Sequence, residues 1–306
     1  MEADCKYPHP KIRMKYFILA VFLISSIQLS AQVEIVAEQD QERNLTLIAF
    51  NKEKIPYTIQ IEFLKLENLE SLKGNIILAT ADPGKTDLIK LQSIYSNEKT
   101  GFQYNTKLFK GNFQETIPSN LPYLIPGEAD QPVKISPLSV QYSDPSKKDS
   151  YTGVGFYFEE ETSIVYPRKG IVSEMKMDLE ANTSGPSNFD SENYIEIYHE
   201  DGTFSRLSGL KKNSETVAVG ELVYPGQVIA TSELDANQSK QHVKMVQSRW
   251  EFGEKGMTWV NFPVNVFTED GTITSSEELE NIVISHPLDL ITQEMDKKEL
   301  KKFQKN

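Results

Sequence analysis

The chain has 306 residues, of which 39% are hydrophobic and 25% are charged, a composition typical of a soluble globular protein. Its 44 acidic and 32 basic residues give a net charge of −12, which excludes nucleic acid as the main partner because binding phosphates requires a basic surface. Cys5 is the only cysteine, and the histidines are His9, His199, His242 and His286. A disulfide framework and a thiolate zinc site are therefore excluded.

The first 31 residues have the pattern of an export signal. Basic residues at 11, 13 and 15 precede an apolar run over 17–29, which ends in the small residues Ser30 and Ala31. The run is shorter than a transmembrane helix. We therefore expect residues 1–31 to be a signal peptide, with Met14 as an alternative start, and the mature chain to begin at Gln32 without a transmembrane segment. Cleavage removes four basic and two acidic residues and takes the net charge from −12 to −14.

Short alternating strands separated by turn signals fill residues 32–118. Segments such as NLTLIAFN and YTIQIEFLKLENL alternate apolar and polar residues, and Asp82-Pro83-Gly84 is one of the turns between such segments. The spacing predicts a β-sandwich of roughly immunoglobulin size. Residue types used in catalysis do not cluster here, so a binding or spacer module is the expectation.

The remainder divides into a junction, a second β-rich domain and a tail. Six prolines between 118 and 145 indicate a Pro-rich junction over 119–150. Residues 151–285 again alternate, with a hairpin turn predicted at His199-Glu200-Asp201-Gly202. Residues 286–306 predict a short helix or a polar tail with a solvated, Lys-rich end. The predicted fold class is mainly β, with two β-domains in series.

One stretch resembles a known family. Residues 193–230 read NYIEIYHEDGTFSRLSGLKKNSETVAVGELVYPGQVIA. This is similar to the LytM or lysostaphin-type zinc metallopeptidases, which cut peptide cross-links in bacterial cell walls, and the likeness extends over 122–273. The matching positions are Asn193, Ile197, His199, Asp201, Gly202, Thr203, Leu210, Val219, Gly220, Val223, Gly226, Gln227 and Ile229. The resemblance implies an antiparallel β domain of the duplicated-hybrid-motif type, in the periplasm or envelope of a Gram-negative, Bacteroidetes-like bacterium.

The positions that carry zinc chemistry in that family are changed in this chain. The family takes ligands from the His and Asp of an "H-x-G-x-D" motif and from the second His of "HLH". Tyr151 and Gly155 stand at the first two positions, and Lys244 stands at the third. Of the two catalytic histidines, one is replaced by Gly209 and the other is kept as His242. The resemblance therefore implies an inactive homologue with no catalytic residue and no zinc.

Lys244 has two possible roles. An ammonium group has no lone pair and repels a divalent cation, so this side chain cannot be a zinc ligand at neutral pH. It either occupies the vacated metal position as a fixed positive charge or is an ordinary solvent-facing lysine of a strand. If the family groove persists, the candidate binding residues are Lys244, His242, Arg206 and Tyr157.

The sequence thus predicts a non-catalytic envelope protein that binds peptidoglycan or a partner protein and regulates a cell-wall hydrolase. Two alternatives remain open at this point. One is an active zinc metalloendopeptidase with substituted ligands, and the other is a structural subunit of an envelope complex. The oligomeric state does not follow from the sequence.

Overall fold

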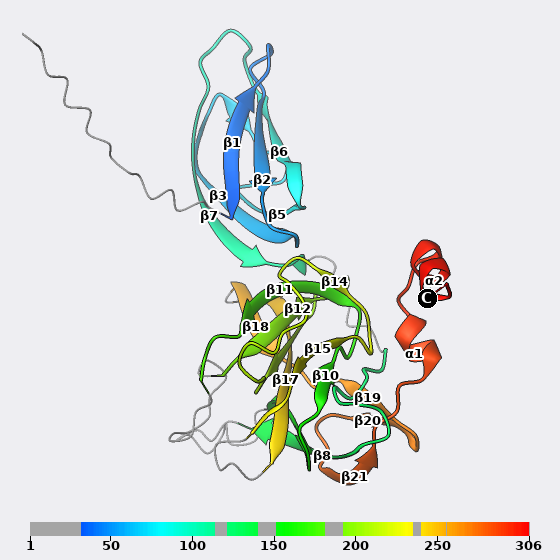
Figure 1. Ribbon diagram of the computed structural model, residues 1–306. Helices are drawn as coiled ribbons and strands as arrows, with labels where there is room; N and C mark the ends of the chain where they lie inside the picture. The colour runs from blue at the N-terminus through cyan, green and yellow to red at the C-terminus, as the bar shows by residue number, and fades with distance from the viewer. Residues whose placement is uncertain are drawn as a thin grey trace, which may run out of the picture. The chain divides into compact units, whose positions relative to one another are not determined.

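The computed structural model describes residues 32–113, 121–139, 151–180, 192–234, 240–254 and 256–305 (Figure 1). The expected signal peptide lies outside these residues. The protein is mainly β, with several antiparallel sheets followed by two short helices, as the sequence predicts. Among the described residues, neither helix is long or apolar enough to cross a bilayer.

Residues 33–110 form two facing sheets, drawn in blue and cyan in Figure 1. The strand orders are β1-β2-β6-β4 and β5-β3-β7, and side chains from both sheets share one core, among them Leu47, Ile59, Ile61 and Leu91, all fully buried. This arrangement is a β-sandwich. The strands are β1 (Val33–Gln39), β2 (Leu45–Asn51), β3 (Tyr57–Glu67), β4 (Leu69–Glu70), β5 (Ile76–Ala81), β6 (Gly84–Ser93) and β7 (Gly101–Lys110).

A ten-stranded sheet dominates the second half of the chain. Its order is β14-β11-β12-β13-β17-β9-β8-β21, and β16 and β18 also pair with β17. The strands are β8 (Pro132–Ser139), β9 (Tyr151–Phe158), β11 (Gly170–Lys176), β12 (Tyr194–Tyr198), β13 (Phe204–Ser208), β14 (Leu222–Val223), β16 (Glu233–Leu234), β17 (Gln241–Gly253), β18 (Gly256–Asn261) and β21 (Leu279–Val283). Two smaller ribbons join β10 (Ser163–Val165) to β15 (Val228–Thr231) and β19 (Asn265–Thr268) to β20 (Gly271–Thr274).

The segment expected to be a junction contributes a strand to this sheet. β8 pairs with β9 on one side and with β21 on the other, although it contains Pro132 and Pro137. Prolines weaken the strand signal because they cannot donate a ladder hydrogen bond. Residues 140–150, which belong to the same predicted junction, lie outside the described residues.

Three tight turns of the second half use glycine, among them the predicted hairpin turn at 199–202. Gly202, Gly220 and Gly226 have φ angles of 82°, 87° and 80°. These values lie in the left-handed region, which only glycine enters without steric cost. The turn at Gly202 joins β12 to β13, and β13 carries part of the candidate site.

The expected C-terminal helix or tail is a pair of short helices, α1 (Leu288–Thr292) and α2 (Lys297–Phe303). α2 begins with a capping box, in which Asp296 accepts from the amides of Lys298 and Glu299 while the Glu299 side chain accepts from the amide of Asp296. This arrangement satisfies the first amides of the helix and fixes where it starts.

A buried amide side chain of the large sheet lacks hydrogen-bond partners. Gln247 of β17 is fully buried, and neither its amide nitrogen nor its amide oxygen has a hydrogen-bond partner. We expect Gln247→Met to raise the free energy of unfolding by about 1–3 kcal/mol, the cost of burying such groups unpaired. Urea unfolding measures this difference.

Gln241 on the same strand is the matched control, because its side-chain oxygen accepts a hydrogen bond of 2.9 Å from Ser232. Gln241→Met should therefore lower stability. A loss of stability in Gln247→Met of the same size would contradict an unsatisfied amide at position 247.

Candidate functional site

Three neighbouring strands bring most of the predicted site residues onto one face of the ten-stranded sheet. β17 pairs with β9 so that His242 lies opposite Tyr157 and Lys244 opposite Gly155. It pairs with β13 on its other side, which sets Lys244 opposite Ser208 and Val246 opposite Arg206. Cross-strand partners and residues two apart share a face, so these side chains lie together. We call this set the β9–β13–β17 face.

The opposite face of the same strands forms the core. Val154, Phe156, Leu207, Val243 and Met245 are all fully buried and belong to one hydrophobic cluster. Their alternation with the site residues holds the β9–β13–β17 face in register, because a slip by one residue would expose the core.

Lys244 is held in an ion pair at the centre of this face. Its ammonium nitrogen lies 2.6 Å from a carboxylate oxygen of Glu192, just before β12, and the two side chains are 12% and 11% exposed. Of the two roles considered for Lys244, a solvent-facing lysine is therefore wrong. The fixed charge stands at the position where the family resemblance implies a metal ligand.

Tyr157 covers the second changed ligand position. A Cβ atom added at Gly155 would lie 2.8 Å from a ring carbon of Tyr157 and 2.9 Å from its hydroxyl oxygen. A larger residue at 155 would have to displace this ring, so the two positions are matched to each other. The aspartate that the family resemblance implies at position 155 does not fit beside Tyr157 as it lies.

Gly209 and His242 are matched in the same way. Gly209 has a φ of 80°, and a Cβ atom there would lie 2.9 Å from Nε2 of His242. His242 is buried, its ring stacks on that of Tyr157, and its Nδ1 donates to the carbonyl oxygen of Glu233 at 3.1 Å. Because a carbonyl only accepts, Nδ1 carries the proton. The ring of His242 and the left-handed backbone at Gly209 therefore both exclude the catalytic histidine that the family resemblance implies at position 209.

Arg206 extends the face with a second set of charges. Its guanidinium stacks 4.2 Å from the ring centre of Tyr194 and donates to Glu196 at 3.1 Å. Lys110 of β7 also pairs with Glu196, at 2.6 Å, and with Glu174 at 2.8 Å. The charges on this part of the face are therefore balanced by neighbours of opposite sign.

Tyr151, which stands at the first ligand position, is hydrogen-bonded to a residue outside the β9–β13–β17 face. Its hydroxyl is hydrogen-bonded to Ser275 at 2.9 Å, and burial raises the pKa of this phenol to about 12. A neutral phenol with a structural partner is not a metal ligand at ordinary pH.

The residues of this face do not fit a catalytic zinc ion, which needs three protein ligands and an open position. Gly155 and Gly209 offer no donor atoms, Lys244 offers a cation, and His242 is the single remaining imidazole. Across the part of the chain that the structure describes, three or more His, Cys, Asp or Glu side chains nowhere gather into a possible metal site.

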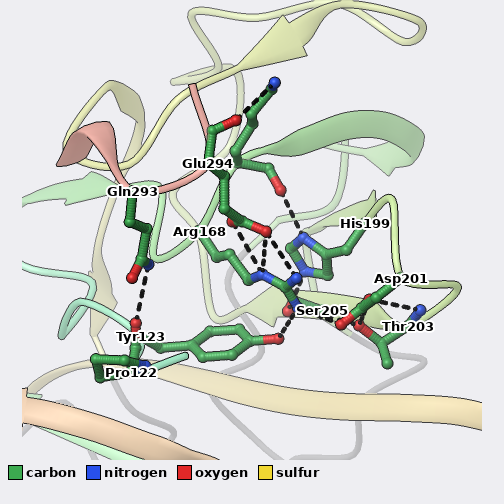
Figure 2. Close-up of polar contacts among 10 residues, drawn as sticks. Pro122, Tyr123, Arg168, His199, Asp201, Thr203, Ser205, Gln293 and Glu294 are labelled. Atoms are coloured by element: carbon green, nitrogen blue, oxygen red, sulfur yellow. Dashed lines mark hydrogen bonds and ion pairs between the residues drawn. The ribbon is translucent and has the colours of Figure 1, made fainter. Parts of the chain in front are cut away.

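A second polar cluster was not identified from the sequence as a unit (Figure 2). Arg168 is 2% exposed and lies between two carboxylates, Asp201 at 2.8 Å and Glu294 at 2.7 Å. It also donates to the hydroxyl of Tyr123 at 3.0 Å. Burial acts to lower the pKa of the guanidinium, but Tyr123, Glu294 and Asp201 outweigh it and raise the pKa. Because Glu294 lies between α1 and α2, the cluster fastens the C-terminal segment to the sheet.

His199 lies beside this cluster and has a structural role. Its Nδ1 donates to the carbonyl oxygen of Lys169 and its Nε2 accepts from the hydroxyl of Ser205, each at 2.7 Å. The ring is fully buried, and burial together with the charge of Arg168 lowers the pKa of His199 to about 3. Ser205 is also fully buried, so this serine–histidine pair has no access to a substrate.

The buried, neutral His199 predicts a loss of stability in acid. In the unfolded chain the imidazole titrates near its ordinary pKa of about 6.5, so between about pH 6.5 and pH 3 only the unfolded state binds the proton. Stability should therefore fall as the pH falls through this window, by at most about 1.4 kcal/mol per pH unit from this one group. Urea unfolding over this window measures the slope.

The variant His199→Gln should show a shallower dependence on pH than the natural protein, because glutamine has no proton to gain. Lys169 and Ser205 keep a hydrogen-bonding side chain beside them in this variant. Equal slopes for the two proteins would show that His199 is not the group responsible.

Comparison by sequence finds no matching family model and no matching curated protein. Comparison of structures finds similar folds at low identity. The structure of the SpoIIQ–SpoIIIAH pore forming complex matches at 17% identity and a TM-score of 0.32, covering 47% of this chain and 89% of that one. The catalytic domain of lysostaphin from Staphylococcus simulans matches at 17% identity and a TM-score of 0.29, covering 42% and 87%.

A third structure, Csd3 from Helicobacter pylori, matches over more of the chain. It covers 89% of this chain and 82% of its own at 10% identity, with a TM-score of 0.30. The chain is therefore similar in structure to LytM-type peptidases and to SpoIIQ. These matches concern the fold alone.

Proposed function

We propose that this protein is a non-catalytic, LytM-like protein of the bacterial envelope that binds peptidoglycan or an envelope protein through the β9–β13–β17 face. The observation that carries the proposal is the Lys244–Glu192 ion pair, which stands where the family resemblance implies a metal ligand. The expected signal peptide at residues 1–31 supports an envelope location.

The packing around the ion pair supports a face that has lost catalysis but has kept an ordered surface. Tyr157 fills the space beside Gly155, and His242 fills the space beside Gly209. A site that merely decayed would leave such spaces open or collapse them. Here the replacements fit each other, which favours a face that has been kept for contact with another molecule.

The chemistry of the face suits a polar ligand that carries both charges. The face carries its charges in pairs, Lys244 with Glu192 and Arg206 with Glu196, beside the aromatic rings of Tyr157 and Tyr194. Peptides of the cell wall and loops of a partner protein both present charges and amides to such a surface. Regulation of a cell-wall hydrolase follows if the bound partner is such an enzyme.

The test measures binding of the mature protein to purified sacculi by co-sedimentation and to envelope proteins by affinity capture. The variant Lys244→Met combined with Glu192→Leu removes both charges while keeping similar volume. We expect binding to fall by about tenfold or more, the effect of losing charged hydrogen bonds. Lys90→Met combined with Asp40→Leu is the control, since this pair lies on the exposed surface of the sandwich at 3.1 Å.

Three results would contradict the proposal. The first is cleavage of peptide cross-links by the natural protein, which would favour an active peptidase. The second is unchanged binding in the Lys244 and Glu192 double variant. The third is partner capture that depends only on the sandwich, which would favour a structural subunit.

A further inference from the structure

A cavity of about 430 Å³ lies between the C-terminal helices and the turn that joins β14 to β15. Its volume falls within the range of about 300–1,000 Å³ that is usual for small-molecule sites. Much of its wall is apolar or aromatic, with Tyr224 on the turn side and Ile291, Met295 and Phe303 on the helix side. This cavity lies outside the β9–β13–β17 face and has no part in the proposed function.

The cavity is preformed, because hydrogen bonds fasten the helices that close it. Lys169 donates to the backbone oxygen of Glu294 at 3.0 Å and to the carboxylate of Glu299 at 2.8 Å. The hydroxyl of Tyr224 donates to the same carboxylate at 3.0 Å, so the turn and α2 are joined across the cavity. A site held in this way loses little conformational freedom when a ligand enters.

The charge at the cavity is positive. Glu299 lines it, but the ammonium of Lys169 neutralises that carboxylate. Lys302 also lines the cavity, is exposed, and has no carboxylate partner among the described residues.

The exposed side of α2 reinforces this charge. Lys297, Lys298, Lys301 and Lys302 fall within an arc of about 140° at the helical spacing of 100° per residue. All four are exposed, in a chain whose net charge is −12. The opposite side of the helix carries Phe303, which faces the cavity.

From the apolar walls and the adjoining cations we infer that the cavity binds an anionic amphiphile. Its hydrocarbon chain lies among Tyr224, Ile291, Met295 and Phe303, and its phosphate or carboxylate group pairs with Lys302. Burial of the chain supplies affinity, and the lysine selects the sign of the head group. Such a molecule comes either from a bilayer that contains anionic lipid or from a pool of single amphiphiles.

Isothermal titration of the mature protein tests the site with three probes. Dodecyl phosphate should bind as a single molecule per chain. Dodecyltrimethylammonium, which has the same chain and a cationic head, and inorganic phosphate, which has no chain, should not bind. Co-sedimentation with vesicles of phosphatidylglycerol in phosphatidylcholine then identifies the source, since retention points to a bilayer lipid and its absence to a free amphiphile.

Matched variants locate the site. Lys302→Gln should weaken binding of dodecyl phosphate by about tenfold or more. Lys301→Gln removes the same charge from the same helix without touching the cavity and should have a much smaller effect. Met295→Trp fills the cavity and should abolish binding while the circular dichroism spectrum stays unchanged.

Four results would overturn the inference. These are no binding of dodecyl phosphate by the natural protein, equal binding of the cationic amphiphile, equal losses in the two lysine variants, and undiminished binding in a folded Met295→Trp. If Met295→Trp does not fold, the comparison of Lys302→Gln with Lys301→Gln decides, because both side chains are exposed.

Discussion

Replacing Arg168 by methionine is expected to lower the free energy of unfolding by about 3–5 kcal/mol, the usual cost of removing one partner from a buried ion pair. The guanidinium is 2% exposed and holds Asp201 and Glu294, whose side chains are only 13% and 16% exposed. Without it both carboxylates stay desolvated and lose their cation. Urea unfolding of the natural and variant proteins measures the loss.

The same variant should release the C-terminal segment. Glu294 joins α1 to α2, and Arg168 contacts it through both Nε and Nη2. Trypsin should therefore cleave at the lysines of α2 faster in Arg168→Met than in the natural protein. Arg168→Lys keeps the charge but cannot make the paired contact, so it should lie between the two.

Exposed pairs provide the control for Arg168. Lys90→Met removes a partner from the surface pair with Asp40, whose side chains are 55% and 41% exposed, and should change stability by less than about 1 kcal/mol. A change of that small size in Arg168→Met would contradict the role assigned to the buried cluster.

Either single substitution in the Lys244–Glu192 pair is expected to cost about 3–5 kcal/mol, while the double substitution restores most of the loss. Lys244→Met leaves the carboxylate of Glu192 in a site that is 11% exposed, and Glu192→Leu leaves the ammonium of Lys244 in one that is 12% exposed. In the double variant no buried charge remains. The difference between the sum of the single effects and the double effect gives the coupling energy.

A coupling energy of several kcal/mol would establish that the two side chains depend on each other in solution. The same cycle on Lys90 and Asp40 should give less than about 1 kcal/mol. If the Lys244 and Glu192 substitutions are additive, the ion pair does not form as described, and the observation that carries the proposed function is lost.

Most strands could be predicted from the sequence because alternation of apolar and polar residues is a local property. The alternating residues 57–63 begin β3, and the apolar run at 45–51 forms β2. β8 could not be predicted because Pro132 and Pro137 interrupt the strand pattern. Its place depends on pairing with β9 and β21 rather than on its own composition.

The candidate site was predictable to the extent that it follows strand register. Once Tyr157 and Gly155 are on β9 and His242 and Lys244 are on β17, antiparallel pairing alone places them opposite each other. The partner of Lys244 could not be predicted, because Glu192 lies 52 residues away and precedes a different strand.

The Arg168 cluster shows the same limit more strongly. Arg168 and Glu294 are 126 residues apart, and neither belongs to a motif that signals pairing. The hairpin turn predicted at His199 is present, but the place of its ring depends on contacts with Lys169 and Ser205. Contacts of this kind depend on tertiary packing, which local patterns do not encode.

Elemental analysis tests most directly whether the β9–β13–β17 face has lost its zinc chemistry. The mature protein is incubated with zinc, freed of excess metal and analysed, alongside an assay for cleavage of peptide cross-links. We predict no stoichiometric zinc and no cleavage, because Gly155, Gly209 and Lys244 supply no ligand and His242 alone cannot hold the ion. One tightly held zinc per chain that is lost in His242→Ala would contradict this prediction and with it the proposal of a non-catalytic protein.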